Sequence, residues 1–278
     1  MIHNEFNWKS EDGKRIFAQS WQPENDIKAV VCLVHGMGEH SSRYTELAEA
    51  LTGAGFAIIT FDHRGHGKSE GIRGHIPDYN SFMSDINNLI NESTIRFTAK
   101  KKFLYGHSMG GNLVLNYALR NRDKDLAGVI STGAWLKLVN NPSPFMNFVA
   151  DVLNKIFPAL RVFHGVKNTD VAHKEAVEEI HPPKDELRHP WISVRTYINL
   201  RDAAVWAMQN ASNFNFPLLL LHGGSDKVTL PEGSKEFAGF VKTECECKII
   251  PELYHEIHRD TGKEEVFAVI INWLNKHI

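Results

Sequence analysis

The sequence predicts an α/β fold: a mostly parallel, eight-stranded sheet with helices on both faces and an inserted all-helical cap. Short apolar runs alternate with stretches whose apolar residues recur at helical spacing, which is the pattern of βαβ units. A glycine-rich turn joins one of these strands directly to one of these helices. The alternation is interrupted once. We therefore expect one core, residues 1–134 and 216–278, and a cap insertion, residues 135–215.

Four of the expected strands precede the glycine-rich turn. The first two alternate polar and apolar side chains and flank an Asp-Gly pair, which indicates a hairpin. The third and fourth are apolar throughout, as strands buried on both faces of a sheet are, and a stretch with helical spacing separates them. The four strands are expected at residues 5–9, 15–21, 29–34 and 56–61.

The fifth expected strand begins at Lys102 and leads into a Gly-x-Ser-x-Gly turn centred on Ser108. A serine on a sharp strand-to-helix turn crowds its neighbours, and the flanking glycines, Gly106 and Gly110, remove the interfering Cβ atoms. The serine hydroxyl is then exposed beside a helix N-terminus, where developing negative charge is stabilised. Ser108 is therefore the candidate nucleophile.

A second Gly-x-Ser-x-Gly sequence surrounds Ser69. The residues that follow it include Gly74 and Pro77, which cannot open a regular helix. Because a nucleophile elbow needs a strand before the serine and a helix after it, we interpret Ser69 as a turn residue.

Three further strands complete the expected sheet, at residues 126–132, 217–221 and 244–250, and an amphipathic helix ends the core. The cap between the first and second of these strands contains six prolines and no buried apolar run. Its apolar spacing predicts helices at residues 144–157, 169–180 and 193–209. Ser143 is a suitable N-cap for the first helix, because proline follows it at the first helical position.

Composition excludes several classes of function. A net charge of −2 offers no electrostatic case for binding nucleic acid. The N-terminus has no apolar signal segment and no run approaches the ~18 apolar residues of a membrane span, so we expect a cytoplasmic protein. The cysteines Cys32, Cys245 and Cys247 form no disulfide framework, and the alternation of the last two fits strand packing better than metal binding.

An activated serine needs a base, and the base needs a partner that fixes its tautomer. In sheets of this type such groups follow the carboxyl ends of strands. Asp226 follows the seventh expected strand and His255 follows the eighth. The order serine, aspartate, histidine is that of the α/β-hydrolases and differs from the order in other triad folds.

Fifteen histidines compete for the role of the base. His255 is favoured over His258 because it lies nearer the strand end, and the choice between them stays open at this point. His63, His66, His107 and His222 are interpreted as structural.

Two other aspartates compete with Asp226. We expect Asp62 to form a structural salt bridge in the turn that contains Arg64, and Asp202 lies within the cap. The spacing His255-x-x-His258 brings no third and fourth ligand with it, so we expect no metal and no cofactor.

An oxyanion hole needs two N–H donors. Met109 follows the nucleophile and supplies the first candidate. Met37 supplies the second, because it lies in a glycine-rich loop after the third expected strand, where the backbone approaches closely.

Four sequence stretches together resemble the monoacylglycerol lipase family of α/β-hydrolases, including its lysophospholipase-like members. They are His35-Gly36-Met37-Gly38-Glu39-His40 with Arg43-Tyr44, the run from Asp62 to Gly71, Gly106-His107-Ser108-Met109-Gly110-Gly111, and Tyr254-His255-Glu256-Ile257-His258. The resemblance implies a serine hydrolase with a triad of Ser108, Asp226 and His255 and oxyanion donors at Met37 and Met109. It also implies hydrolysis of a monoacylglycerol to fatty acid and glycerol, with a lysophospholipase or a small-ester carboxylesterase as alternatives.

The first cap helix favours a lipid ester as substrate. It carries more apolar surface than packing on one side requires, so we expect Phe145, Phe148, Val149 and Val152 to contact an acyl chain. The same face could contact a membrane surface peripherally, or simply dock the cap on the core.

Two other classes of function remain as alternatives: a non-catalytic binding protein, and an enzyme that cleaves haloalkanes or epoxides. A binding protein without catalysis would normally lack a triad residue, and here all three positions are filled. Enzymes that cleave haloalkanes or epoxides have aspartate where Ser108 stands, which argues against that class.

Overall fold

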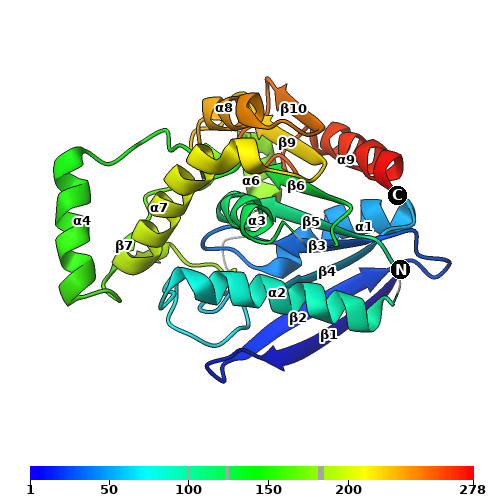
Figure 1. The fold of residues 1–278 in the computed structure, drawn as a ribbon, viewed down its shortest axis with the longest axis horizontal. Helices are drawn as coiled ribbons and strands as arrows, with labels where there is room; N and C mark the ends of the chain where they lie inside the picture. The colour runs from blue at the N-terminus through cyan, green and yellow to red at the C-terminus, as the bar shows by residue number, and fades with distance from the viewer. Residues whose placement is uncertain (99, 123–124, 181–184) are drawn as a thin grey trace.

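The computed structural model describes residues 1–98, 100–122, 125–180 and 185–278 (Figure 1). Its centre is an eight-stranded sheet. In chain order the strands are β1 (Ile2–Lys9), β2 (Arg15–Gln22), β3 (Val30–Val34), β4 (Ala57–Phe61), β5 (Lys102–His107), β6 (Gly128–Thr132), β9 (Leu218–Gly223) and β10 (Cys245–Ile250).

The strand order across the sheet is β1-β2-β4-β3-β5-β6-β9-β10. The six strands from β4 to β10 are parallel, whereas β1 and β2 pair antiparallel at one edge. The prediction of a mostly parallel, eight-stranded sheet is therefore confirmed. The β3–β5 register pairs Val34 with Gly106, so the loop after β3 begins beside the serine turn after β5.

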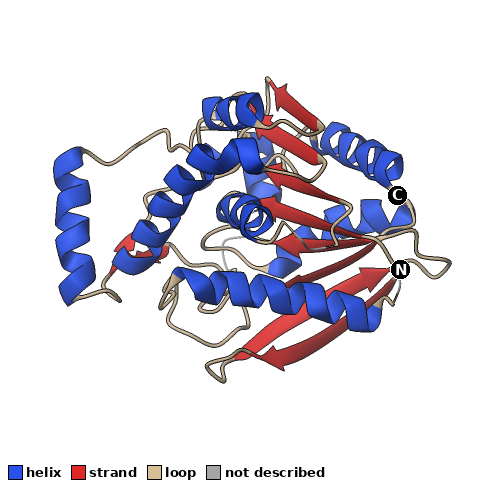
Figure 2. Cartoon of the chain, viewed as in Figure 1, coloured by secondary structure: helices blue, strands red, loops and turns tan. Residues whose placement is uncertain are grey.

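Helices cover both faces of the sheet (Figure 2). One apolar cluster contains side chains of α2 (Tyr79–Arg96), α3 (Met109–Arg120) and α8 (Pro231–Phe240), and the other contains side chains of α1 (Thr45–Gly53) and α9 (Lys263–His277). Alternate residues of β3 enter opposite clusters, for example Cys32 and Leu33. A strand buried on both faces needs apolar residues at every position, which explains the continuous apolar runs.

The cap lies between β6 and β9. It comprises α4 (Pro144–Ile156), β7 (Arg161–Phe163), α5 (Asn168–Val171), α6 (Lys174–Ile180), β8 (Trp191–Ser193) and α7 (Val194–Asn210). Figure 1 shows α4 at the outer edge of the molecule, with α7 between it and the core. In the parts of the chain that the structure describes, no helix is both long and apolar enough to cross a membrane.

Two predictions about the cap are wrong. The cap is not all-helical, because β7 and β8 form a two-stranded antiparallel sheet, and strands of three residues are too short to show an alternating pattern. The single helix expected at residues 169–180 is broken into α5 and α6. At the break, the backbone N–H and the ring of His173 both bond Oδ1 of Asp260 in the core, at 3.0 and 2.8 Å. This tertiary contact takes the N–H group that a continuous helix would use.

The other two cap helices form as predicted. The Ser143 hydroxyl accepts a hydrogen bond from the N–H of Met146 at the start of α4, and the Ser193 hydroxyl accepts one from Thr196 at the start of α7. Both serines therefore satisfy backbone donors that the first helical turn leaves unpaired.

Candidate active site

Ser108 stands at the junction of β5 and α3 with φ 56° and ψ −115°, and it is the one non-glycine residue with positive φ among the described residues. The flanking glycines make this turn possible. A Cβ atom on Gly106 would overlap the carbonyl oxygen of Gly110, and a Cβ atom on Gly110 would overlap the carbonyl oxygen of Val34. The sequence therefore forms a nucleophile elbow.

Three polar side chains from separate loops meet at this elbow. The Ser108 hydroxyl lies 2.9 Å from Nε2 of His255, and Nδ1 of His255 lies 2.7 Å from Oδ2 of Asp226. Asp226 follows β9 and His255 follows β10, so both come from carboxyl ends of strands. Because an ionised carboxylate only accepts hydrogen bonds, Nδ1–H donates to Asp226, and Nε2 accepts from the serine hydroxyl.

Asp226 is buried and its position is fixed by other donors. Its Oδ1 accepts the N–H groups of Val228 and Thr229 at 2.7 and 2.9 Å, and its Oδ2 accepts the Thr229 hydroxyl at 2.9 Å. Burial alone would raise the pKa of this carboxyl, but His255 and His222 more than offset burial and lower it. Asp226 is therefore a charged, preorganised acceptor.

The pKa of His255 is shifted in the opposite direction. Burial by itself lowers the pKa of the imidazole, yet the Asp226 carboxylate outweighs burial and raises it above the usual histidine value. This environment stabilises the imidazolium that forms when the ring accepts a proton from serine.

His258 is placed differently. Its ring stacks on Tyr44 at 4.5 Å between centroids, and neither ring nitrogen has a hydrogen-bond partner within the described chain. Burial lowers the pKa of His258 well below its usual value. His255, and not His258, thus lies between serine and aspartate.

Two of the histidines that were interpreted as structural, His107 and His222, contact neighbouring polar side chains. Nδ1 of His107 lies 3.1 Å from the Thr132 hydroxyl. Nε2 of His222 lies 3.1 Å from Oδ2 of Asp226, so a second imidazole faces the same carboxylate. His222 and Asp226 lie only four residues apart at the end of β9, so this contact is local, although the sequence analysis did not predict it.

The rival serine and aspartates do not join this arrangement. The Ser69 hydroxyl donates to the Asp62 carbonyl at 2.6 Å and accepts from Phe17 N–H, as a turn residue does. The salt bridge expected between Asp62 and Arg64 is wrong. Asp62 accepts from backbone and hydroxyl groups of Ser41, whereas Arg64 pairs with a buried carboxylate on α2. An aspartate at the start of a tight turn accepts hydrogen bonds from nearby backbone N–H groups, and here these donors take the place of Arg64.

Asp202 lies on α7 and pairs with its neighbour Arg201 at 2.8 Å. Of the three aspartates, Asp226 is the one that contacts His255.

The loop after β3 approaches the elbow closely. A Cβ atom on Gly36 would lie 3.2 Å from Cβ of Ser108. The Met37 and Met109 N–H groups are our candidate oxyanion donors. Among the described residues, neither N–H has a hydrogen-bond acceptor. The loop is held by Glu39, whose Oε1 accepts from Gly36 N–H and from the Tyr44 hydroxyl. Glu39 was missed as a supporting residue, although it stands in the resemblance motif.

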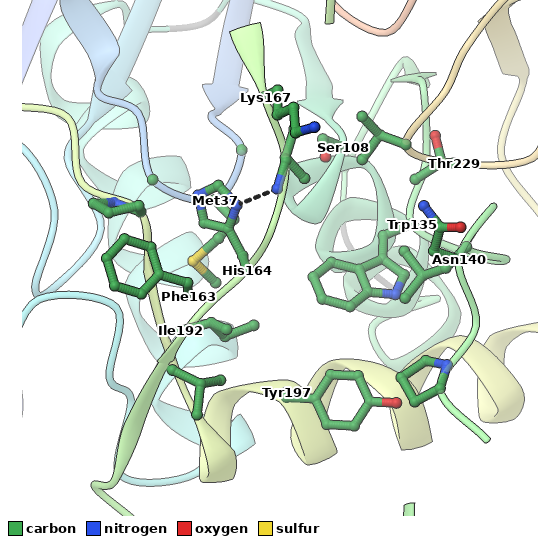
Figure 3. A pocket seen from close by; sticks show the side chains of 18 of the residues that line it. Met37, Ser108, Trp135, Asn140, Phe163, His164, Lys167, Ile192, Tyr197 and Thr229 are labelled. Atoms are coloured by element: carbon green, nitrogen blue, oxygen red, sulfur yellow. Dashed lines mark hydrogen bonds between the residues drawn. The ribbon is translucent and has the colours of Figure 1, made fainter. Parts of the chain in front are cut away.

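Ser108 opens into a cavity of about 790 Å³ between core and cap (Figure 3). Phe145 and Val149 line this cavity, as expected, but Phe148 and Val152 do not. A helix presents only one side to a cavity, and these two residues project away from it. Further apolar walls come from residues that the sequence did not reveal, since they converge from separate cap segments: Trp135, Leu138, Leu153, Phe163, Ile192 and Tyr197.

Metal-ligand geometry is not found at the site. In the described ranges, no three histidine, cysteine, aspartate or glutamate side chains gather closely enough to hold an ion.

Comparisons with known proteins agree with the fold and motifs. The profile of the family described as "Serine aminopeptidase, S33" matches residues 25–262. A monoacylglycerol lipase from Mycolicibacterium smegmatis is 30% identical over 282 residues, which cover 99% of this chain and 98% of that protein. An uncharacterised abhydrolase domain-containing protein from Dictyostelium discoideum is 31% identical, and this chain spans only 29% of its length.

The fold also matches a solved structure. The crystal structure of Paleococcus ferrophilus monoacylglycerol lipase superposes with a TM-score of 0.82 at 34% identity and covers all of both chains. The chain therefore belongs to the monoacylglycerol lipase-like family of α/β-hydrolases, and it is a carboxylic ester hydrolase.

Proposed function

We propose that the chain hydrolyses esters of long-chain fatty acids, monoacylglycerols foremost, through a triad of Ser108, His255 and Asp226. The observation that carries this proposal is the hydrogen-bonded series from Ser108 to Asp226 at the wall of a largely apolar cavity. A hydroxyl activated by a buried histidine–aspartate pair is suited to acyl transfer.

The reaction proceeds in two steps. His255 takes the Ser108 proton while Oγ attacks the ester carbonyl, and the oxyanion that forms receives hydrogen bonds from the Met37 and Met109 N–H groups. The imidazolium then gives its proton to the leaving alcohol, and an acyl-serine remains. Water repeats the sequence with His255 as base, which releases the fatty acid and restores Ser108.

The cavity supports a lipid substrate. Aromatic and aliphatic side chains supply most of its wall, and Figure 3 shows Trp135, Phe163, Ile192 and Tyr197 around the space below Ser108. About 790 Å³ is enough for a drug-sized or larger ligand, and an acyl chain gains about 0.8 kcal/mol for each buried CH₂ group. The mycobacterial relative is named for the same substrate class. Lysophospholipids and small carboxylic esters are the alternative substrates.

The outer cap helix supports delivery of that substrate from a lipid surface. No residue of α4 is buried, and its exposed apolar side chains include Phe145 at 73% and Phe148 at 64% exposure. The helix has one side against the cavity and another toward solvent. A helix of this kind can enter the interface of a membrane and take up an acyl chain there.

The test is labelling with a fluorophosphonate probe, followed by hydrolysis of monoacylglycerols of increasing chain length. We expect Ser108→Ala to abolish labelling and to lower ester hydrolysis by roughly 10⁴-fold or more. Ser69→Ala is the matched control, because Ser69 occupies the second Gly-x-Ser-x-Gly sequence and should still label. Hydrolysis that survives in Ser108→Ala would refute the proposed nucleophile. A preference for acetyl or butyryl esters over decanoyl and longer esters would favour a small-ester esterase instead.

A further inference from the structure

The cavity wall contains an arginine for which the described residues supply no counter-ion at ion-pair distance. Arg188 precedes β8 and lines the same cavity as Ser108. Among the described residues, its one side-chain hydrogen bond runs from Nη2 to Oδ1 of Asn168 at 3.2 Å, and its buried Nε has no hydrogen-bond partner. Within the described chain, no carboxylate lies at ion-pair distance from this guanidinium.

The carboxylates of this region are engaged elsewhere. Glu256 pairs with Arg43 at 2.6 Å, Asp185 pairs with His40 at 3.0 Å, and Glu39 accepts from the loop after β3. Arg188 is therefore a half-buried cation that Glu39, Asp185 and Glu256 face without pairing with it directly. Withdrawing such a charge from water without a partner is unfavourable, which points to an anionic ligand.

Arg188 is adjacent in sequence to a residue that packs on the loop after β3. The next residue, His189, donates its N–H to the carbonyl of Gly38, and its own carbonyl packs so tightly on Gly38 that a Cβ atom there would overlap it. Arg188 is thus adjacent to the loop that carries Met37.

Asn168, the partner of Arg188, is anchored near the base. It lies on α5, and the last residue of α5, Val171, accepts the N–H of Glu256 at 2.7 Å, one residue after His255. Figure 3 shows Lys167, the neighbour of Asn168, toward the end of the cavity where Ser108 lies, and Tyr197 toward the opposite end. The Arg188–Asn168 pair therefore joins a segment that contacts the oxyanion loop to a segment that contacts the residue after the base.

The two ends of the cavity differ in chemistry. Apolar side chains such as Phe145 and Val149 line the part that suits an acyl chain, whereas Lys167, Asn168 and Arg188 add polar and cationic groups to the wall. The carboxylates of Glu39 and Glu256 also line the cavity, but Glu39 accepts from Gly36 N–H and Glu256 pairs with Arg43. Guanidinium binds phosphate oxygens with paired, charge-assisted hydrogen bonds. We propose that Arg188 binds a phosphate group on the alcohol part of the substrate, so that the chain also hydrolyses monoacylated glycerophosphates. This inference rests on the proposed ester hydrolysis at Ser108.

The test compares two substrates that differ only by one phosphate: a 1-acylglycerol and the 1-acylglycerol 3-phosphate with the same acyl chain. Both are assayed below the concentration at which they aggregate. We expect Arg188→Gln to lower kcat/KM for the phosphate ester roughly ten- to hundred-fold, and to change kcat/KM for the uncharged ester less than about threefold. Glutamine can keep a hydrogen bond to Asn168 without the charge, and Arg188→Lys should retain an intermediate rate on the phosphate ester.

The matched control is Arg259→Gln. Arg259 is also partly buried and has an unpartnered Nε, but it does not line the cavity, so its replacement should leave the ratio of the two rates unchanged. Melting temperatures of all variants identify any loss that comes from folding.

Four outcomes would overturn the inference. Equal losses on both substrates in Arg188→Gln would show a structural role, and no loss on either would show that Arg188 does not contact the substrate. Hydrolysis of the uncharged ester alone by the unmodified protein would refute phosphate recognition and leave the proposed function standing. Hydrolysis of neither ester, without fluorophosphonate labelling, would refute the proposed function together with this inference.

Discussion

The elbow helix α3 and the cap helix α4 are nearly equal in length, with 12 and 13 residues, and they have opposite surroundings. Every residue of α3 from Met109 to Leu119 is buried, whereas no residue of α4 is. Packing on all sides of α3 holds Ser108 and its strained backbone in one position. The helix α4 lacks such packing: its apolar side chains face the cavity and solvent, and polar contacts such as Arg201 with Asp151 and Tyr197 with Asn147 tie it to α7.

This difference separates two tasks. Catalytic geometry tolerates errors of only a few tenths of an ångström, so the groups that perform chemistry belong on a rigid, buried scaffold. Substrate selection depends on which surfaces the cap presents, and a weakly packed helix can change there without disturbing the triad. Three predictions test this division, and the largest effect is expected in the core.

Replacement of His255 should damage the chemistry far more than replacement of His258. We expect His255→Ala to lower kcat/KM by roughly 10³- to 10⁵-fold, because the base that contacts Ser108 is lost. His258→Ala should lower the melting temperature instead, since it empties the space against Tyr44. Ester hydrolysis and thermal unfolding of both variants provide the measurement. A greater loss of activity in correctly folded His258→Ala would overturn the assignment of the base.

The second prediction concerns pH. His255 must be neutral to accept a proton, and Asp226 raises its pKa, so activity should fall about tenfold per pH unit below a midpoint above about 6.5. Asp226→Asn removes the charge that raises the pKa, so the midpoint should shift to lower pH at a much reduced rate. Profiles of kcat/KM against pH for both proteins check this expectation. An unchanged midpoint in Asp226→Asn would contradict the electrostatic coupling.

The smallest effect on chemistry is expected in the cap. Phe148 and Phe157 are exposed and do not line the cavity, so their double replacement by serine should change hydrolysis of a short, dissolved ester less than about twofold. Binding to lipid vesicles should fall roughly tenfold or more, because two aromatic anchors are lost.

The matched control for this variant is Ile95→Ser. Ile95 is 72% exposed on α2, which belongs to the core domain and not to the cap. Its replacement should leave vesicle binding, measured by co-sedimentation, unchanged. Equal weakening of vesicle binding by both variants would show that exposed apolar area in general, and not the cap helix, accounts for binding.

Local sequence signals predicted the elements of the core well, for identifiable reasons. A strand buried on both faces must be apolar throughout, and an elbow must carry small residues at fixed positions around the serine. These requirements act over a few consecutive residues, so the sequence alone shows where they are met. Ser108, Asp226 and His255 were found in this way, since each follows a recognisable strand.

The cap was predicted less well because its structure depends on distant contacts. The short strands β7 and β8 pair with each other across 27 intervening residues, 164–190. The break between α5 and α6 comes from the bond between His173 and Asp260, 87 residues apart. Phe148 and Val152 share the apolar pattern of Phe145 and Val149, and only the position of α4 beside the cavity distinguishes the pairs.

The sequence by itself determined the parallel core, the elbow serine and the strand ends that bear its partners, because backbone sterics and burial act locally on each of them. Spacing along the chain left His255 and His258 open and the family resemblance favoured His255, whereas the tertiary structure showed that His255 reaches Ser108. It also decided which cap residues face the substrate and that Arg188 lies in the cavity wall without a counter-ion in the described chain. Those relations are set by how loops and helices from distant parts of the chain pack against one another, and no local pattern records them.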